Sequence, residues 1–237
     1  NSPVVSAGMS KTEEIRNKLL EFKQTKKPIV AYNEVYGMKS YYLSSVADKL
    51  YINPMGVIDH KGMSATLMFF KGLLEKLNID LQIFRLGKFK SAIEPFTLDK
   101  MSNSNREQLK LMLNSINDNI IDSISSQRNI SSTKIHKDAN QLKLSSAKIC
   151  LEEKYVDGIL YEDQVKDTLR LLLGDDKLKI ISLNKYSNVK NKKKDISRNK
   201  IAIVYANGGI NSGKGDEKSI GSITTSKAIE NARKDKN

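Results

Sequence analysis

Short apolar runs alternate along this chain with longer stretches in which apolar residues recur at helical spacing. The runs predict buried strands at 28–32, 49–52, 81–86 and 201–205. The amphipathic stretches predict helices at 10–27, 37–47, 67–77, 146–153, 162–173 and 224–233, and a further long helix near residue 104. Strands that alternate with helices favour an α/β fold with a largely parallel sheet and surrounding helices.

Two of the predicted helices begin with a capping-box pattern. Ser10 with Glu13 and Ser104 with Glu107 each place a hydroxyl and a carboxylate where they can bind the free N–H groups of a first turn. Both helices carry an apolar stripe that we expect to face the core. The stripes comprise Ile15, Leu19 and Phe22 on the first helix, and Leu109, Leu113, Ile116, Ile120 and Ile124 on the second.

Length and composition narrow the function classes. A chain of 237 residues, 39% of them hydrophobic, is long enough for one full core and part of a second. The net charge of +13 raises the question of nucleic-acid binding, but aromatic residues are only 6% of the chain and no Trp is present for base stacking. We therefore expect no nucleic-acid partner. An anionic membrane surface would suit this charge at least as well, and a generic lysine-rich composition explains it better than either partner.

Cysteine and histidine usage predicts no metal or cofactor site. Cys150 is the only cysteine, and its place in an apolar helical stretch predicts a small buried thiol. His60 and His136 are the only histidines, and both lie in polar, turn-like surroundings that predict surface or loop positions. No set of these residues has the spacing of metal ligands.

The segment 184–199 differs from its surroundings. It is rich in basic residues and nearly free of apolar ones, which predicts a solvated linker between a domain at 1–183 and the start of another at 200–237. A lone strand and helix cannot bury their own apolar faces, so we expect the second domain to be truncated at residue 237.

Lys90 is the strongest candidate for chemistry. It follows the predicted strand 81–86 and lies between Phe89 and an apolar pair, where burial, together with the neighbouring charge of Lys88, would lower the cost of losing its proton. The alternative is an ordinary exposed loop lysine, because the chain contains 40 lysine and arginine residues.

The residues around Lys90 carry a family resemblance. Phe89–Phe96 resembles the catalytic-lysine segment of signal peptide peptidase A of the long, two-domain type, peptidase family S49. That family usually has tyrosine where Phe89 stands and valine where Ile93 stands. Three more segments fit the same family in the same order, so that the resemblance covers nearly the whole chain: Tyr41–Asp48, Asn53–Gly56 and Ala206–Ile210.

The resemblance implies a ClpP/crotonase-like spiral fold, with the first domain lacking its opening elements. It implies that Lys90 is the general base of a Ser–Lys dyad whose serine lies beyond residue 237, so that the chain is an inactive fragment of a membrane-associated endopeptidase. The implied substrates are signal peptides and other apolar peptides, and no cofactor is needed. A homo-oligomer such as a tetramer, an anchor outside this chain and a place on the extracytoplasmic (periplasmic) side of a bacterial membrane are implied as well.

Three other features imitate a reactive or binding site. Ser6 precedes a helix as a nucleophile would, but without the glycines that would free the backbone to hold an oxyanion. Ser91 is adjacent to Lys90, and successive side chains rarely converge on one atom. The glycine-rich stretch 208–215 lacks the final hydroxyl of a phosphate loop. A different reading of the whole chain is a non-catalytic half that uses this fold only to build an oligomer.

Overall fold

The computed structural model describes residues 5–84, 86–87, 89–174, 177–189, 201–216 and 218–235. The chain divides into two compact units, Asn1–Leu178 and Lys179–Asn237. The domain boundaries expected from the sequence stay predictions.

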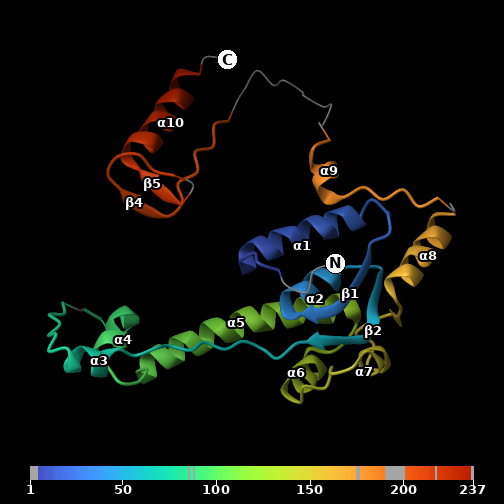
Figure 1. The fold of residues 1–237 in the computed structure, drawn as a ribbon, viewed down its shortest axis with the longest axis horizontal. Coiled ribbons are helices and arrows are strands. Elements are labelled where there is room, and N and C mark those ends of the chain that lie inside the picture. The colour runs from blue at the N-terminus through green and yellow to red at the C-terminus, as the bar shows by residue number, and fades with distance from the viewer. Residues whose placement is uncertain are drawn as a thin grey trace. The chain divides into compact units, whose positions relative to one another are not determined.

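A parallel sheet organises the first unit. It contains β1 (Val30–Gly37), β2 (Lys49–Asp59) and β3 (Gly158–Ile159) in the order β1-β2-β3. Both pairings are parallel, and α2 (Met38–Ser44) connects β1 to β2 (Figure 1). The sequence-based prediction of an α/β fold with a parallel sheet is confirmed, and β1 and β2 both run further than the predicted strands.

A bulge interrupts the pairing of the first two strands beside a glycine. The register between β1 and β2 shifts between Asn33 and Val35. A Cβ atom on Gly56 would lie 2.6 Å from the backbone oxygen of Glu34 and 2.5 Å from a side-chain carbon of Ile52. Only glycine therefore fits at this close approach of two backbones.

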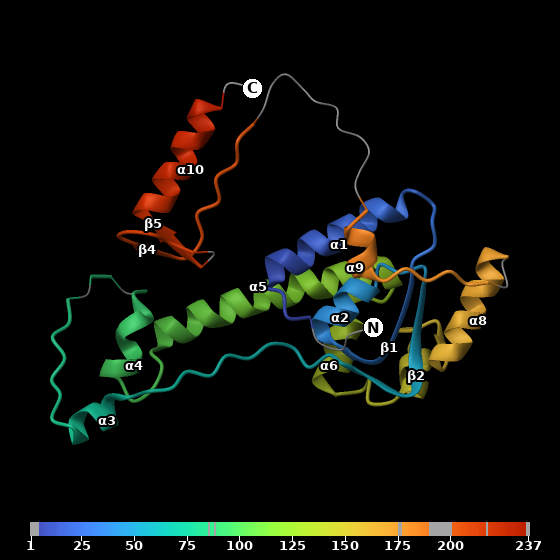
Figure 2. The same cartoon turned by 45° about the horizontal axis from the view of Figure 1, so that its top comes forward.

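Helices that contact β2, α2 or one another surround the sheet (Figure 2). They are α5 (Asn103–Arg128), α6 (Ser132–Asn140) and α7 (Ala147–Glu152), of which α6 had no counterpart in the prediction. Their buried apolar side chains form one cluster with those of β1, β2 and α2. It includes Tyr36, Tyr41, Leu50, Ile52, Ile58, Ile120, Ile121, Ile124, Ile135, Ala147 and Cys150, so that the predicted burial of Cys150 is confirmed.

Buried tyrosines tie these elements together. The hydroxyl of Tyr41 donates to the carbonyl of Tyr155 at 2.7 Å, and that of Tyr36 donates to the carbonyl of Tyr51 at 2.8 Å. The Tyr155 hydroxyl in turn donates to a carboxylate oxygen of Asp138 at 3.0 Å. Burial raises the pKa of all three hydroxyls, so each stays a hydrogen-bond donor.

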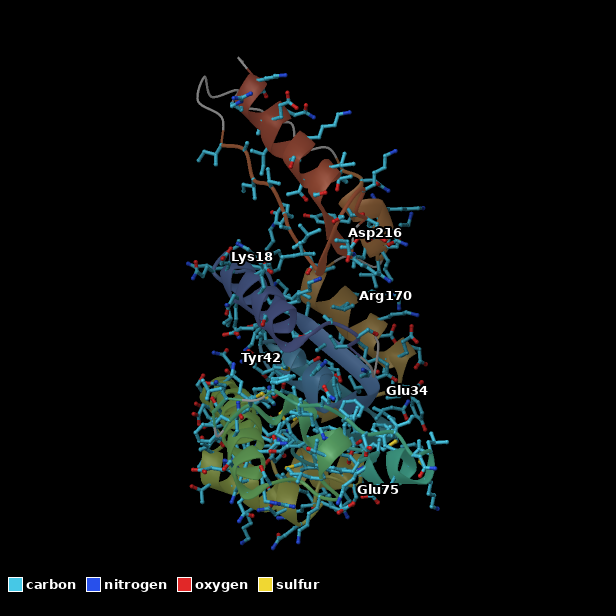
Figure 3. All side chains as sticks on the ribbon, turned by 90° about the vertical axis from the view of Figure 1, so that its left-hand side faces the viewer. Lys18, Glu34, Tyr42, Glu75, Arg170 and Asp216 are labelled. Carbon is cyan, nitrogen blue, oxygen red and sulfur yellow. The ribbon has the colours of Figure 1, made fainter. Side chains whose placement is uncertain are left out.

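The first helix, α1 (Met9–Lys23), buries a different face from the predicted one. Thr12 and Arg16 face inward, whereas Ile15 and Phe22 are exposed. The Arg16 guanidinium donates to the carbonyls of Tyr42 and Ser123 and to the Ser45 hydroxyl, and it lies over the Tyr42 ring. These buried acceptors hold α1 against α2, where Figure 3 labels Lys18 on α1 and Tyr42 on α2.

Both predicted capping boxes are wrong in position. The N-cap of α1 is Gly8, so Ser10 already lies inside the helix. The N-cap of α5 is Ser102, whose hydroxyl accepts from the Asn105 N–H at 3.1 Å. The predicted stripe of α5 is buried at Ile120 and Ile124 and only half-buried at Leu109, Leu113 and Ile116.

The predicted strand 81–86 is not formed. Residues 81–84 and 86 belong to no helix or strand, and the Phe84 and Leu86 side chains are 97% and 91% exposed. The helix before them, α3 (Lys71–Lys76), is shorter than the predicted 67–77. A strand needs a neighbour for its backbone groups, and the described sheet offers none to this segment.

The end of the first unit follows the prediction closely. α7 and α8 (Glu162–Leu173) lie where the sequence pattern places them, and the short strand β3 lies between them. α8 begins with the Tyr161 N–H donating to the Gln164 side chain at 2.8 Å. It ends at Gly174, whose φ of 62° suits a left-handed cap.

The second unit contains α9 (Leu183–Ser187), β4 (Gly209–Asn211), β5 (Ser219–Gly221) and α10 (Ser222–Lys234). α9 occupies the first part of the predicted linker 184–199, and residues 190–200 lie outside the described residues. The predicted strand 201–205 is wrong: these residues are exposed, and the strand begins at Gly209. The predicted helix 224–233 is confirmed as α10.

Candidate active site

Lys90 lies at a short turn that leads into a 3₁₀ helix, η1 (Ser91–Ile93). The residue is exposed, and so are the described residues of 81–87 that precede it. The sequence-based expectation of a partly desolvated amine is therefore wrong for this chain, because the strand that would have buried it is absent. The role of Lys90 as a general base stays a prediction.

Directly after η1, a buried carboxyl group anchors the segment. Glu94 opens α4 (Glu94–Thr97), and its side chain is 0% exposed. One of its oxygens accepts from the Ser102 hydroxyl at 2.6 Å. The other accepts from the Ser102 N–H at 3.2 Å and from the Asn105 side-chain amide at 3.0 Å.

In the sequence, Glu94 is identified only as part of the family segment Phe89–Phe96, and no role is predicted for it. The signal that could have revealed it is a glutamate followed eight residues later by a serine at a helix start. A carboxylate at a helix N-terminus is stabilised by the free N–H groups and the dipole of the helix.

Aromatic packing adds a second attachment on the same segment. The Phe70 N–H donates to the Pro95 carbonyl at 2.6 Å, and the Phe70 and Phe96 rings stack with their centroids 5.8 Å apart. Lys71 contacts the Asp99 carboxylate at 3.2 Å. These contacts hold α3 against α4 at the N-terminal end of α5, and the sheet lies at the other end of α5 (Figures 1 and 2).

An apolar groove of about 180 Å³ borders this segment. Leu81, Ile83 and Phe96 supply its apolar surface, and Lys71 and Glu75 supply charged groups. Such a surface can accept apolar side chains of a peptide but offers few polar groups for a small charged ligand.

Of the other candidates, Ser6 is exposed just before the N-cap of α1, and Ser91, beside Lys90, is the first residue of η1. Within the glycine-rich stretch 208–215, the N–H groups of Gly213 and Gly215 donate to hydroxyls of Ser222 and Thr224 at the start of α10. These two amides are therefore occupied by hydrogen bonds to the start of α10.

The histidine prediction is half wrong. His60 is 5% exposed, and burial lowers its pKa. It lines a cavity of about 300 Å³ with Asp59, Lys61 and Leu144, because β2 continues past the predicted strand and carries the residue into the fold. His136 lies half-exposed on α6, with its ring nitrogen 3.5 Å from the Asp118 carboxylate.

Within the described ranges, no group of three or more His, Cys, Asp or Glu side chains could hold a metal ion. Among the helices that the structure describes, none is both long and apolar enough to cross a bilayer.

Comparisons with known proteins agree on one family. The model of peptidase family S49 matches residues 21–174, a range that contains the Lys90 segment. Protease 4 of Salmonella typhi is 32% identical over 228 residues, covering 92% of this chain and 36% of the relative. The chloroplastic serine protease SPPA of Arabidopsis thaliana is 33% identical over 235 residues, covering 97% of this chain and 35% of the relative.

A more distant relative carries a related name. The putative signal peptide peptidase SppA of Enterococcus faecium is 23% identical over 171 residues, covering 72% of this chain and 48% of the relative. The chain spans about a third of the length of Protease 4 and of the chloroplastic protease. With a parallel α/β sheet, the ClpP-like fold of the family and a family match over most of its length, this chain belongs to peptidase family S49.

Proposed function

We propose that this chain is part of a serine endopeptidase in which Lys90 is the general base of a Ser–Lys dyad. The observation that carries the proposal is the family match over residues 21–174, which runs through the Lys90 segment. In this chemistry a serine hydroxyl attacks the peptide carbonyl while the neutral lysine takes its proton. The lysine then returns that proton to the leaving amine.

The exposure of Lys90 sets a condition on this chemistry. The pKa of a lysine amine must fall from about 10.4 to roughly 7 before the amine can act as a base at neutral pH, a difference of about 4–5 kcal/mol. Because Lys90 is exposed in this chain, the proposal requires another surface, such as the substrate or a further part of the protein, to cover it during catalysis.

We propose that the nucleophilic serine comes from outside residues 1–237. Ser91 is adjacent to the lysine along the chain, and Ser6 lacks the glycines expected of a nucleophile loop. A homo-oligomer such as a tetramer is a part of the same proposal, because neighbouring subunits can supply both the cover and the serine.

The proposed substrates are apolar peptides, signal peptides among them. The groove beside the Lys90 segment and the exposed side chains of Phe84, Leu86 and Phe89 offer apolar surface to such a chain. A relative is named a putative signal peptide peptidase, which agrees with this class. Action at the extracytoplasmic side of a bacterial membrane belongs to the same proposal.

Replacing Lys90 tests the dyad. In the protein at the length that its gene encodes, we expect Lys90→Ala to lower kcat/KM for an apolar peptide ester at least 100-fold, since a general base contributes about 10²–10⁴-fold. Lys100→Ala, at an exposed lysine of the loop before α5, is the matched control and should leave the rate unchanged. Undiminished turnover in Lys90→Ala would refute the dyad.

The exposure of Lys90 also favours a second candidate, a non-catalytic half that serves assembly. In that case the unchanged protein would form its oligomer but would not hydrolyse any apolar peptide ester. The same assay therefore separates the two candidates.

A further inference from the structure

Glu94 is buried although exposed apolar residues lie close to it along the chain. Around it, Phe84, Leu86 and Phe89 are exposed, whereas the Glu94 side chain is 0% exposed. A carboxyl group withdrawn from water must recover its lost hydration through hydrogen bonds, or the fold is destabilised. The four-residue helix α4 alone does not require a glutamate at this position.

Three donors to Glu94 belong to the start of α5. Ser102 gives its hydroxyl and its N–H, and Asn105, itself buried, gives its side-chain amide. The Ser102 hydroxyl also accepts from the Asn105 N–H at 3.1 Å, so one serine joins the carboxyl group to the cap of the helix. The carboxyl group therefore sits at the positive end of a helix of 26 residues.

The other end of α5 is fixed in the core. Ile120, Ile121 and Ile124 are each at most 1% exposed and belong to the main hydrophobic cluster. α5 is one continuous helix from Asn103 to Arg128 (Figure 2). Its N-terminal end, which binds Glu94, is therefore held in place by the end that is buried in the core.

Only η1 separates Glu94 from Lys90. Lys90 is the N-cap residue of η1, and the chain passes from Ile93 directly into α4. The backbone at Lys90 is thus held on its C-terminal side by the Glu94 hydrogen bonds. On its N-terminal side, the described residues 79–84 and 86–87 lie in no helix or strand that could hold it.

We infer that Glu94 is a positioning residue for Lys90: its hydrogen bonds to Ser102 and Asn105 fix the lysine segment to the end of α5. This inference rests on the proposed function, in which Lys90 is the base. A base misplaced by about 1 Å can lose roughly 100-fold in rate. The contacts of Glu94 therefore act on turnover without any contact to the reacting atoms.

Two variants test the inference in the protein at its encoded length. Glu94→Gln keeps the shape but turns an amide donor toward the donors of Ser102, and Ser102→Ala removes the hydroxyl alone. For both we expect kcat for an apolar peptide ester to fall about 10- to 100-fold while KM changes less than 3-fold. Glu107→Gln is the matched control, since Glu107 is an exposed glutamate on α5, and this change should leave kcat unchanged.

Amide hydrogen exchange supplies a readout that does not depend on turnover. In Glu94→Gln and in Ser102→Ala, a peptide covering 89–97 should exchange faster, whereas one covering 120–124 should keep its protection. Unchanged kcat, or unchanged exchange at 89–97, in both variants would overturn the inference. So would a loss of protection at 120–124 in both, because Glu94 would then serve only the stability of the fold.

The two proposals fail in different ways. If Lys90→Ala is fully active, the dyad is wrong whatever Glu94 does. If Lys90→Ala is inactive and both Glu94→Gln and Ser102→Ala are fully active, the dyad stands and the positioning role is wrong.

Discussion

Buried polar side chains, each with its own set of partners, join the helices of the first unit. Arg16 joins α1 to α2 and α5 through carbonyl and hydroxyl acceptors, and burial lowers its pKa. Tyr41 joins α2 to the turn before β3, and Glu94 joins α4 to α5. Removing one partner of such a buried pair leaves the other unsatisfied, which costs more than the bond itself contributes.

Tyr41→Phe tests this at a single oxygen. The Tyr41 hydroxyl is the donor to the Tyr155 carbonyl at 2.7 Å, and the residue is 1% exposed. Its loss should lower the free energy of unfolding by about 1–2 kcal/mol. Urea denaturation measures this as a lower midpoint with an unchanged slope. Tyr186→Phe, at an exposed tyrosine, should shift nothing, and equal midpoints for both variants would contradict the assignment.

At the scale of elements, the sequence predicted best where an element depends on its own residues. α8 at 162–173 and α10 within 222–234 carry their own amphipathic patterns, and the structure has both. The strands at 81–86 and 201–205 were predicted from apolar runs alone and are absent. A strand is stable only when it pairs with a neighbouring strand, and an apolar run by itself does not show which strand it would pair with.

The same limit explains the helix starts and the candidate site. Ser102 rather than Ser104 caps α5 because a tertiary contact with Glu94 adds to the local preference. The residues that flank Lys90 identify it as a candidate. Its exposure could not be predicted from them, because it follows from the absence of the expected strand 81–86. The role of Glu94 could not be predicted from the sequence, because its partners Ser102 and Asn105 lie eight and eleven residues away and become neighbours only in the fold.

The bulge between β1 and β2 yields a prediction for a strand pair. Gly56→Ala would place a Cβ atom 2.6 Å from the Glu34 backbone oxygen and 2.8 Å from that of Asn53. Backbone cannot move aside as a side chain can, so we expect a loss of about 1–3 kcal/mol in the free energy of unfolding.

Gly72→Ala is the control, because nothing lies within 4 Å of its Cβ position in α3. Helix propensity should make that variant neutral or more stable by up to about 1 kcal/mol. Equal stability of the Gly56 variant and the unchanged chain, measured by chemical denaturation, would show that the strands can relax apart.

At the scale of the whole molecule, the net charge of +13 makes carboxylates that pair with lysines important to the stability of the fold at acid pH. Glu153 accepts hydrogen bonds from Lys134 and Lys143, and it follows α7 directly. Lys134 first, and Lys143 second, lower the pKa of Glu153 from 4.5 to about 2. Lys134 also contacts Asp138 on α6, so this cluster joins α6 to the end of α7.

The direction of the pH dependence follows from that lowered pKa. Above pH 4.5 the Glu153 carboxylate is charged in the folded and unfolded chain alike, and its contribution to stability is fully present. As the pH falls from 4.5 to about 2, the unfolded chain takes up the proton first, and this contribution is lost. We therefore expect Glu153→Gln to lower the thermal unfolding midpoint at pH 6 and to flatten its decline between pH 4.5 and 2. Glu152→Gln, at an exposed neighbour 3.9 Å from Lys148, should keep the decline of the unchanged chain. An equally steep decline in Glu153→Gln would show that other carboxylates govern the acid unfolding of this protein.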